Sequence, residues 1–303
     1  MSVQSEFKKF NDKIRLDYDT NSELAEKRDI LLGILENDED LPSFKKLDQV
    51  SYAMHTGIEP GDDREYDIDV GLRFNVSKSE YDPMDLKKDI EELLKNHTEY
   101  GAEIKKPCVT VTYKKDGEPS FHVDLVVYVY EDKENTDSQI YIAKGINSNK
   151  DSQKWEMADP KGLVDYINDG VEKGEQRDQF RRILRYLKRW KHRRFDAKGH
   201  SEPPSIGLTL MALDNFIYYE EDDFSALVHI VDSIVNKFVF EGIDEDGDFL
   251  YRIRLPLPME LAFELNSDIF EKMSDRQMTD FKEKSEKLQS DLNDRSEERR
   301  VGK

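Results

Sequence analysis

The stretch QVSYAMHTGIEPGDDREYDIDVGLRF, from Gln49 to Phe74, decides the fold. It begins with a short polar turn that carries Ser51, crosses a loop rich in Gly, Pro and Asp, and enters a strand with Asp67 and Asp69. Successive strand residues point to opposite faces, so these two carboxylates share one face. The other face is apolar and carries Tyr66, Ile68, Val70, Leu72 and Phe74. This alternation predicts a half-buried strand.

The carboxylate pair indicates a class of chemistry. Two carboxylates about 7 Å apart along a rigid strand suit a pair of Mg²⁺ ions better than an acid–base dyad. A serine turn just upstream of them suits a triphosphate. The stretch therefore favours nucleotidyl transfer.

A third carboxylate, Asp124, lies in the apolar run Phe121–Tyr130. The Asp-Gly pair at 116–117 separates this run from the strand pattern Cys108–Tyr113, and such a pair is a strong hairpin signal. The second run is apolar on both faces apart from His122 and Asp124, which predicts a central, buried strand. A carboxylate there is costly unless it is paired or bound to a metal. We expect a metal ligand, with a structural ion pair as the alternative.

Three carboxylates on adjacent strands make the oxygen-only environment that Mg²⁺ prefers, and Mn²⁺ is an alternative. We expect two ions, because a pair can activate an attacking hydroxyl and stabilise the leaving pyrophosphate. Asp67 and Asp69 would bridge both ions. Asp124 would bind only the ion next to the acceptor 3′-hydroxyl and could take its proton.

Two further segments offer phosphate contacts. A markedly basic helix is expected over Asp178–Phe195, in a chain whose net charge is -20. We expect its Lys188 to contact the triphosphate together with Ser51, although a solvated face that offsets acidic neighbours would also explain the charges. Ser205 falls near the start of the apolar helix expected within 200–213. Helix N-termini favour anions, and a plain N-cap role is equally compatible.

Composition excludes several classes. The 303 residues indicate two domains or one large one. There is no apolar run long enough for a membrane span and no secretory signal at the start. The single cysteine fits a reducing compartment, so we expect a cytoplasmic protein, with no membrane partner, and a monomer. Because nucleic-acid binding depends on Lys and Arg, the acidity argues against a nucleic-acid activator.

The order of these motifs resembles the bacterial cGAS/DncV-like nucleotidyltransferases, which make cyclic oligonucleotide messengers in anti-phage defence. The shared elements are Gln49-Val50-Ser51, Thr56 with Pro60, Glu65–Asp69, His122–Asp124, Lys154-Trp155 with Asp159–Lys161, Tyr186–Trp190 and Pro204–Ile206. The resemblance implies nucleotide contacts from Gln49, Ser51, Lys188 and Ser205. Val50 stands where the family has glycine; we expect an extended backbone there and fewer phosphate contacts from the turn.

The resemblance also implies an α+β fold, with a polymerase-β-like mixed sheet, flanking helices and a C-terminal helical domain. We expect an N-terminal helical brace at 1–40, the nucleotidyltransferase core at 41–150 and the helical domain at 151–294. The last residues, 295–303, read RSEERRVGK and look like a non-native tail.

The expected reaction condenses two nucleoside triphosphates into a cyclic dinucleotide. We expect a purine product such as cyclic GMP-AMP. The enzyme would act in bacterial antiviral signalling, and it would reach any effector only through this diffusible product. One alternative is a synthase of linear oligonucleotides, or an enzyme that transfers a nucleotide to RNA or protein. The other is a catalytically silent nucleotide-binding or partner-binding module, which Val50 keeps open.

Overall fold

The computed structural model of the chain describes residues 2–16, 22–48, 50–61, 65–115, 118–196, 199, 201–258 and 268–301. The chain divides into two compact units. The sheet unit comprises residues 16–53 and 59–164, and the helical unit comprises 1–15, 54–58 and 165–303.

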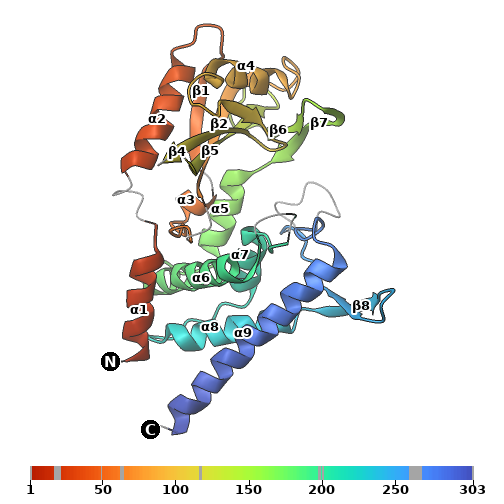
Figure 1. Cartoon of the computed structure of the whole chain (residues 1–303). Coiled ribbons are helices and arrows are strands. Elements are labelled where there is room, and N and C mark those ends of the chain that lie inside the picture. The colour runs from red at the N-terminus through yellow and green to blue at the C-terminus, as the bar shows by residue number, and fades with distance from the viewer. Residues whose placement is uncertain are drawn as a thin grey trace. The chain divides into compact units, whose positions relative to one another are not determined.

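The sheet unit contains a mixed sheet of seven strands within the described residues (Figure 1). The strand order is β1-β2-β5-β4-β3, and β6 pairs with both β5 and β7. The strands are β1 (Phe44–Asp48), β2 (Tyr66–Ser77), β3 (Ala102–Ile104), β4 (Val109–Lys115), β5 (Glu118–Tyr130), β6 (Ile140–Ile146) and β7 (Asn149–Ala158). β2 and β5 run parallel, and the other pairs are antiparallel. The predicted α+β fold with a mixed sheet is confirmed, and β5 is central, as expected.

One face of the sheet forms the core of this unit. β2 buries Ile68, Val70, Leu72, Phe74 and Val76, and β5 buries Phe121, Val123, Leu125, Val127 and Val129 on the same side. Helices α2 (Ser22–Glu36) and α4 (Asp85–Leu94) cover this face with leucine and isoleucine side chains. Fully burying one such side chain contributes about 1.5–3 kcal/mol, so this core fixes which face of β2 and β5 remains for polar residues.

A buried lysine joins α4 to the β3–β4 loop and to strand β6. The Lys87 side chain is fully buried, and its Nζ donates to the carbonyls of Lys105 (2.7 Å), Lys106 (3.1 Å) and Gly145 (2.8 Å). Burial lowers the pKa of Lys87 to about 8. All three ammonium donors are used, which offsets the cost of burying the charge.

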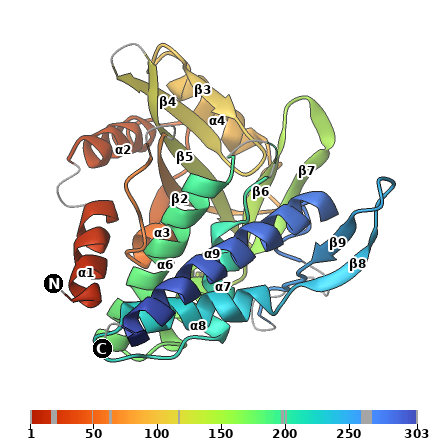
Figure 2. The same cartoon turned by 60° about the horizontal axis from the view of Figure 1, so that its bottom comes forward.

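The helical unit surrounds α6, the basic helix predicted from the sequence. Its elements are α1 (Val3–Ile14), α6 (Glu175–Arg194), α7 (Ser205–Asp214), α8 (Asp223–Val235), β8 (Val239–Ile243), β9 (Phe249–Arg252) and α9 (Asp275–Val301). α1 and α7 pack on α6, and α9 lies along α8 and packs on β9 (Figure 2). The short helix α3 (Val50–Ala53) belongs to the sheet unit, and the boundary between the units falls inside α5 (Pro160–Asp169).

Buried polar contacts hold α6 in place. Asp223 is fully buried and accepts hydrogen bonds from Arg182 Nε (2.7 Å), Arg182 Nη2 (2.8 Å) and the Tyr186 hydroxyl (3.0 Å). Burial opposes ionisation of Asp223, but the Arg182 bonds outweigh it and lower the pKa of the carboxyl. The Tyr186 hydroxyl oxygen also lies 2.8 Å from the Phe7 carbonyl oxygen of α1, so the carbonyl and Asp223 share its single proton.

The N-terminal segment 1–40, expected to act as one brace, divides between the two units. α1 belongs to the helical unit because the rings of Phe7 and Phe10 pack on Tyr186. α2 belongs to the sheet unit because Leu31 and Leu35 enter the core of the sheet. At the other end, α9 crosses the predicted boundary at 294 and includes residues up to Val301. Among the described residues, no helix combines the length and the hydropathy needed to span a bilayer.

Candidate active site

Two of the predicted carboxylates are direct neighbours. In the parallel pairing of β2 with β5, Asp69 lies opposite Asp124 and Asp67 lies opposite His122. Adjacent strands are about 4.8 Å apart, and residues in register point to the same face. The side chain of Asp67 lies outside the described part of the structure. The backbone nevertheless confirms that the three positions lie on adjacent strands.

The carboxylates of Asp69 and Asp124 interact electrostatically. Desolvation, followed by the charge of Asp124, raises the pKa of Asp69 to about 6, although the residue keeps contact with solvent. No described Lys, Arg or His forms an ion pair with either carboxylate. The alternative of a structural ion pair for Asp124 is therefore not supported by the described residues.

Thr110 orients Asp124, a role that the sequence analysis missed. Thr110 lies opposite Asp124 in the pairing of β4 with β5, and its hydroxyl donates to Asp124 Oδ1. Cys108 Sγ is 3.6 Å from Thr110 Oγ1. Burial, and then the nearby charge of Asp124, raises the pKa of the Cys108 thiol to about 12. The thiol therefore stays protonated at neutral pH and is a poor nucleophile.

His122 is fixed by two partners on the same strand face as Asp124. Its Nδ1 is 3.0 Å from Thr112 Oγ1, and its Nε2 pairs with the Glu65 carboxylate. The sequence does contain a pattern that could have identified both threonines. In Val109-Thr110-Val111-Thr112-Tyr113, polar and apolar residues alternate, so the threonines share the face of the acidic groups.

The predicted phosphate-binding residues lie in both units. In the sheet unit, Gln49 is outside the described residues, and Ser51 lies in α3. Val50 is the first residue of α3, so its backbone is helical and the expected extended conformation is wrong. A β-branched residue fits a helical backbone, and no glycine-specific conformation is needed there.

In the helical unit, Lys188 and Ser205 are held by other groups. Lys188 Nζ donates to the Thr56 carbonyl (3.0 Å) and to Thr56 Oγ1 (3.0 Å). Burial, followed by the charges of Lys191 and Arg185, lowers the pKa of Lys188 to about 7. Lys191 Nζ donates to Ser205 Oγ (2.8 Å), a contact that the sequence did not reveal because Lys191 falls on the apolar stripe of α6.

The donor set at Asp69 and Asp124 fits a hard divalent cation. The two carboxylates repel each other, and oxygen ligands of this kind are those that Mg²⁺ and Mn²⁺ prefer. Among the described side chains, no three His, Cys, Asp or Glu residues form a metal-binding group. Asp67, outside that set, is the third predicted ligand.

Comparisons with known proteins agree with this geometry. Residues 44–128 match the family model described as cyclic GMP-AMP synthase DncV-like, nucleotidyltransferase domain. The chain is 25% identical over 183 residues to the cyclic GMP-AMP synthase of Escherichia albertii, which covers 58% of this chain and 38% of that relative. The matched region thus spans little more than a third of the relative's length.

Solved structures show the same fold. Vibrio cholerae DncV cyclic AMP-GMP synthase in complex with nonhydrolyzable GTP has a TM-score of 0.67 and 18% identity, over 93% of this chain and 86% of that one. The Bradyrhizobium diazoefficiens CD-NTase CdnG in complex with GTP has a TM-score of 0.73 and 13% identity, over 97% and 92%.

The mixed sheet with its opposed carboxylates, together with the match over residues 44–128, defines a nucleotidyltransferase. Within that class, residues 44–128 match the nucleotidyltransferase domain of the bacterial cGAS/DncV-like enzymes, and the solved DncV and CdnG structures share the fold of the chain.

Proposed function

We propose that the chain joins two nucleoside triphosphates into a cyclic dinucleotide with release of pyrophosphate. The register match of Asp69 with Asp124 on the central strands carries this proposal. The named relatives, cyclic GMP-AMP synthase and DncV, support a product that contains purines. In this role the protein is a cytoplasmic enzyme of antiviral signalling, and its diffusible product is the messenger.

Asp67, Asp69 and Asp124 would hold Mg²⁺, with Mn²⁺ as a substitute. When bound, a pair of divalent ions stabilises charge on the attacking and leaving oxygens of an in-line displacement. Thr110 keeps the Asp124 carboxylate in one orientation by donating to its Oδ1. Asp124 accepts the proton of the acceptor 3′-hydroxyl, which makes that oxygen the nucleophile toward the α-phosphate of the second nucleotide.

Cations and hydroxyls bind the triphosphate in this proposal. Lys188 exchanges its bonds to Thr56 for phosphate oxygens, and the polyanion favours the protonated ammonium. Ser205 adds a hydroxyl, and Lys191 orients it. Ser51 and Gln49 are further proposed phosphate contacts. Two successive transfers at one set of carboxylates give first a linear and then a cyclic product.

The test is incubation of the full chain with Mg²⁺ and an equal mixture of the four labelled nucleoside triphosphates. Products are treated with alkaline phosphatase and identified by mass spectrometry. A cyclic dinucleotide has no terminal phosphate, so we expect a phosphatase-resistant product of dinucleotide mass that is missing from the Asp124→Asn reaction.

The other outcomes separate the alternatives. Products that are entirely phosphatase-sensitive would show a linear oligonucleotide synthase and refute cyclisation. Label that remains on added RNA or protein would show transfer to that acceptor. Nucleotide binding without pyrophosphate release in either metal would indicate the silent binding module.

A further inference from the structure

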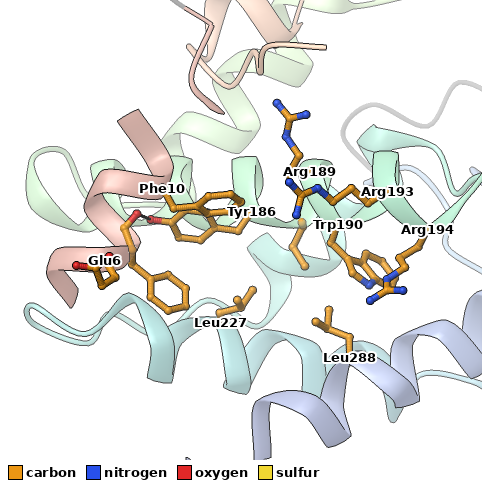
Figure 3. Close-up of a pocket in the computed structure, with 11 residues that line it drawn as sticks. Glu6, Phe10, Tyr186, Arg189, Trp190, Arg193, Arg194, Leu227 and Leu288 are labelled. Atoms are coloured by element: carbon orange, nitrogen blue, oxygen red, sulfur yellow. Dashed lines mark hydrogen bonds between the residues drawn. The ribbon is translucent and has the colours of Figure 1, made fainter. Parts of the chain in front are cut away.

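The helical unit contains an apolar pocket that the proposed reaction does not use. Its volume is about 410 Å³, within the range of about 300–1,000 Å³ typical of small-molecule sites. Four helices contribute the lining residues that matter here, which are Phe7, Phe10, Tyr186, Trp190, Leu227 and Leu288. Figure 3 shows Leu227 of α8 and Leu288 of α9 across from the α6 side chains.

The pocket lies on a different face of α6 from Lys188. Tyr186, Trp190 and Arg193 follow one another at helical spacing and line the pocket. At 100° per residue, Lys188 points nearly opposite to Trp190, and it is bonded to Thr56. A ligand of this pocket is therefore not the triphosphate that Lys188 is proposed to bind.

The mouth of the pocket is basic in a chain whose net charge is -20. Arg193 and Arg194 line it beside Trp190 (Figure 3), and both also line an adjoining hollow of about 260 Å³. Within the described part of the chain, neither arginine forms an ion pair. Lys287, in the adjoining hollow, is instead paired with Asp291 (2.8 Å). Glu6, the carboxylate that also lines the pocket, is paired with Lys9 (3.0 Å). The charge left without an ion-pair partner at this mouth is therefore that of the two arginines.

The aromatic rings of the lining are already packed on one another. Phe10 stacks on Tyr186 with a centroid distance of 5.8 Å, and the Phe7 and Tyr186 rings meet edge to face at 5.2 Å. Trp190 packs edge to face with Phe195 at 5.4 Å. Because these rings already pack on aromatic partners and two leucine side chains complete the lining, the cavity suits a flexible alkyl chain better than a flat ring that needs an open aromatic face.

We propose that this pocket binds a free long-chain carboxylate, with the alkyl chain in the cavity and the carboxylate at Arg193 and Arg194. The alkyl chain gains from leaving water. The guanidinium groups of the two arginines supply paired N–H donors that match the oxygens of a carboxylate. The binding does not depend on the proposed nucleotidyl transfer.

The chain provides its own reporter for a test. It has two tryptophans, Trp155 and Trp190, and only Trp190 lines the pocket. In the full chain with Trp155→Phe, fluorescence therefore reports on Trp190 alone. Dodecanoate, dodecanol and 2-naphthoate are titrated below the concentration at which micelles form, in the absence of nucleotides.

We expect a saturable change of Trp190 emission with dodecanoate. Arg193→Ala/Arg194→Ala should weaken dodecanoate binding at least about tenfold, because charge-assisted bonds are lost, and should leave the weaker binding of dodecanol unchanged. Leu288→Gln should weaken both ligands. The matched control Lys173→Ala/Lys272→Ala removes two exposed cations of the same unit that do not line the pocket, and it should bind dodecanoate like the parent.

Melting curves establish that each variant is folded before it is titrated. A Trp190 signal that does not saturate with dodecanoate would overturn the proposal. So would equal dodecanoate affinity in the parent and the double arginine variant, or tighter binding of 2-naphthoate than of dodecanoate.

Discussion

Asp69 of β2 and Asp124 of β5 lie opposite each other in a parallel strand pair at the centre of the sheet. Like charges in register destabilise a sheet, and the raised pKa of Asp69, about 6, reflects both desolvation and this repulsion. Neutral side chains at these two positions would make the sheet more stable. The pair is therefore best explained by a cationic ligand that needs both carboxylates.

We predict that Asp69→Asn separates activity from stability. Losing a metal ligand should reduce pyrophosphate release at least about 100-fold, beyond the loss of 10–100-fold typical of second-shell changes. In EDTA the same variant should melt at a higher temperature than the wild type, because a repulsive charge is removed. Calorimetry and a pyrophosphate assay measure the two effects.

Asp137→Asn is the matched control for that experiment, because Asp137 is exposed and lies on a loop of the same unit. It should change neither the rate of pyrophosphate release nor the melting temperature in EDTA. Wild-type pyrophosphate release by Asp69→Asn would refute the assignment of the metal site.

We predict that Thr110→Val weakens metal use without unfolding the chain. The variant keeps the shape of the side chain but loses the donor to Asp124 Oδ1, and second-shell losses of this kind cost about 10–100-fold in metal affinity or activity. A Mn²⁺ titration followed by electron paramagnetic resonance should show weaker binding. Thr112→Val, which loses the contact to His122, should bind Mn²⁺ more tightly than Thr110→Val does. Equal curves for both variants would contradict the role of Thr110.

The position of Thr110 also shows which feature of the site the sequence does not predict, namely the exact register of β4 against β5. Alternation predicted the buried face of the strand with Asp67 and Asp69, and the apolar run 121–130 predicted that the strand with Asp124 is central. The Asp-Gly pair predicted the β4–β5 hairpin, which the pairing of Lys115 with Glu118 confirms. Continued without interruption, that register would place Val109 opposite Asp124. A one-residue shift between Tyr113 and Lys114 brings Thr110 there instead. Nothing in the local pattern signals such a bulge.

Buried lysine side chains are the second feature that the sequence did not predict. Lysine is rarely buried, so the sequence gives no reason to expect buried ammonium groups at Lys87 and Lys191. Both are buried in the structure because oxygen atoms from other elements meet their ammonium groups. These partners come from segments distant in the sequence, so only the assembled fold reveals them.

We predict a distinct pH dependence for Lys188. Burial and the neighbouring charges of Lys191 and Arg185 lower its pKa to about 7, whereas the unfolded chain has a lysine pKa of about 10.4. Between these values the unfolded state binds more protons, so this group makes stability rise with pH. The free energy of unfolding of the wild type, minus that of Lys188→Met, should therefore increase from pH 7 to pH 9, by less than about 1.4 kcal/mol per pH unit.

Urea titrations at several pH values measure this difference, and subtraction of the variant removes the contributions of other groups. Lys173→Met, at an exposed position of the same unit, is the control substitution. A difference for Lys188→Met that stays constant from pH 7 to pH 9 would show that Lys188 remains fully charged in the folded chain, and would contradict the prediction.

We predict that Lys87→Met destabilises the sheet unit by at least about 2 kcal/mol. The substitution leaves the carbonyls of Lys105, Lys106 and Gly145 without their ammonium donor, and each unsatisfied buried group costs about 1–3 kcal/mol. Lys88→Met, at the exposed neighbouring position of α4, is the control and should change stability by less than about 0.5 kcal/mol. Hydrogen exchange should place the loss of protection in α4 and the β6–β7 hairpin. Equal unfolding midpoints for the two variants would mean that the three carbonyls find other donors, and that Lys87 is not the link between α4 and these segments.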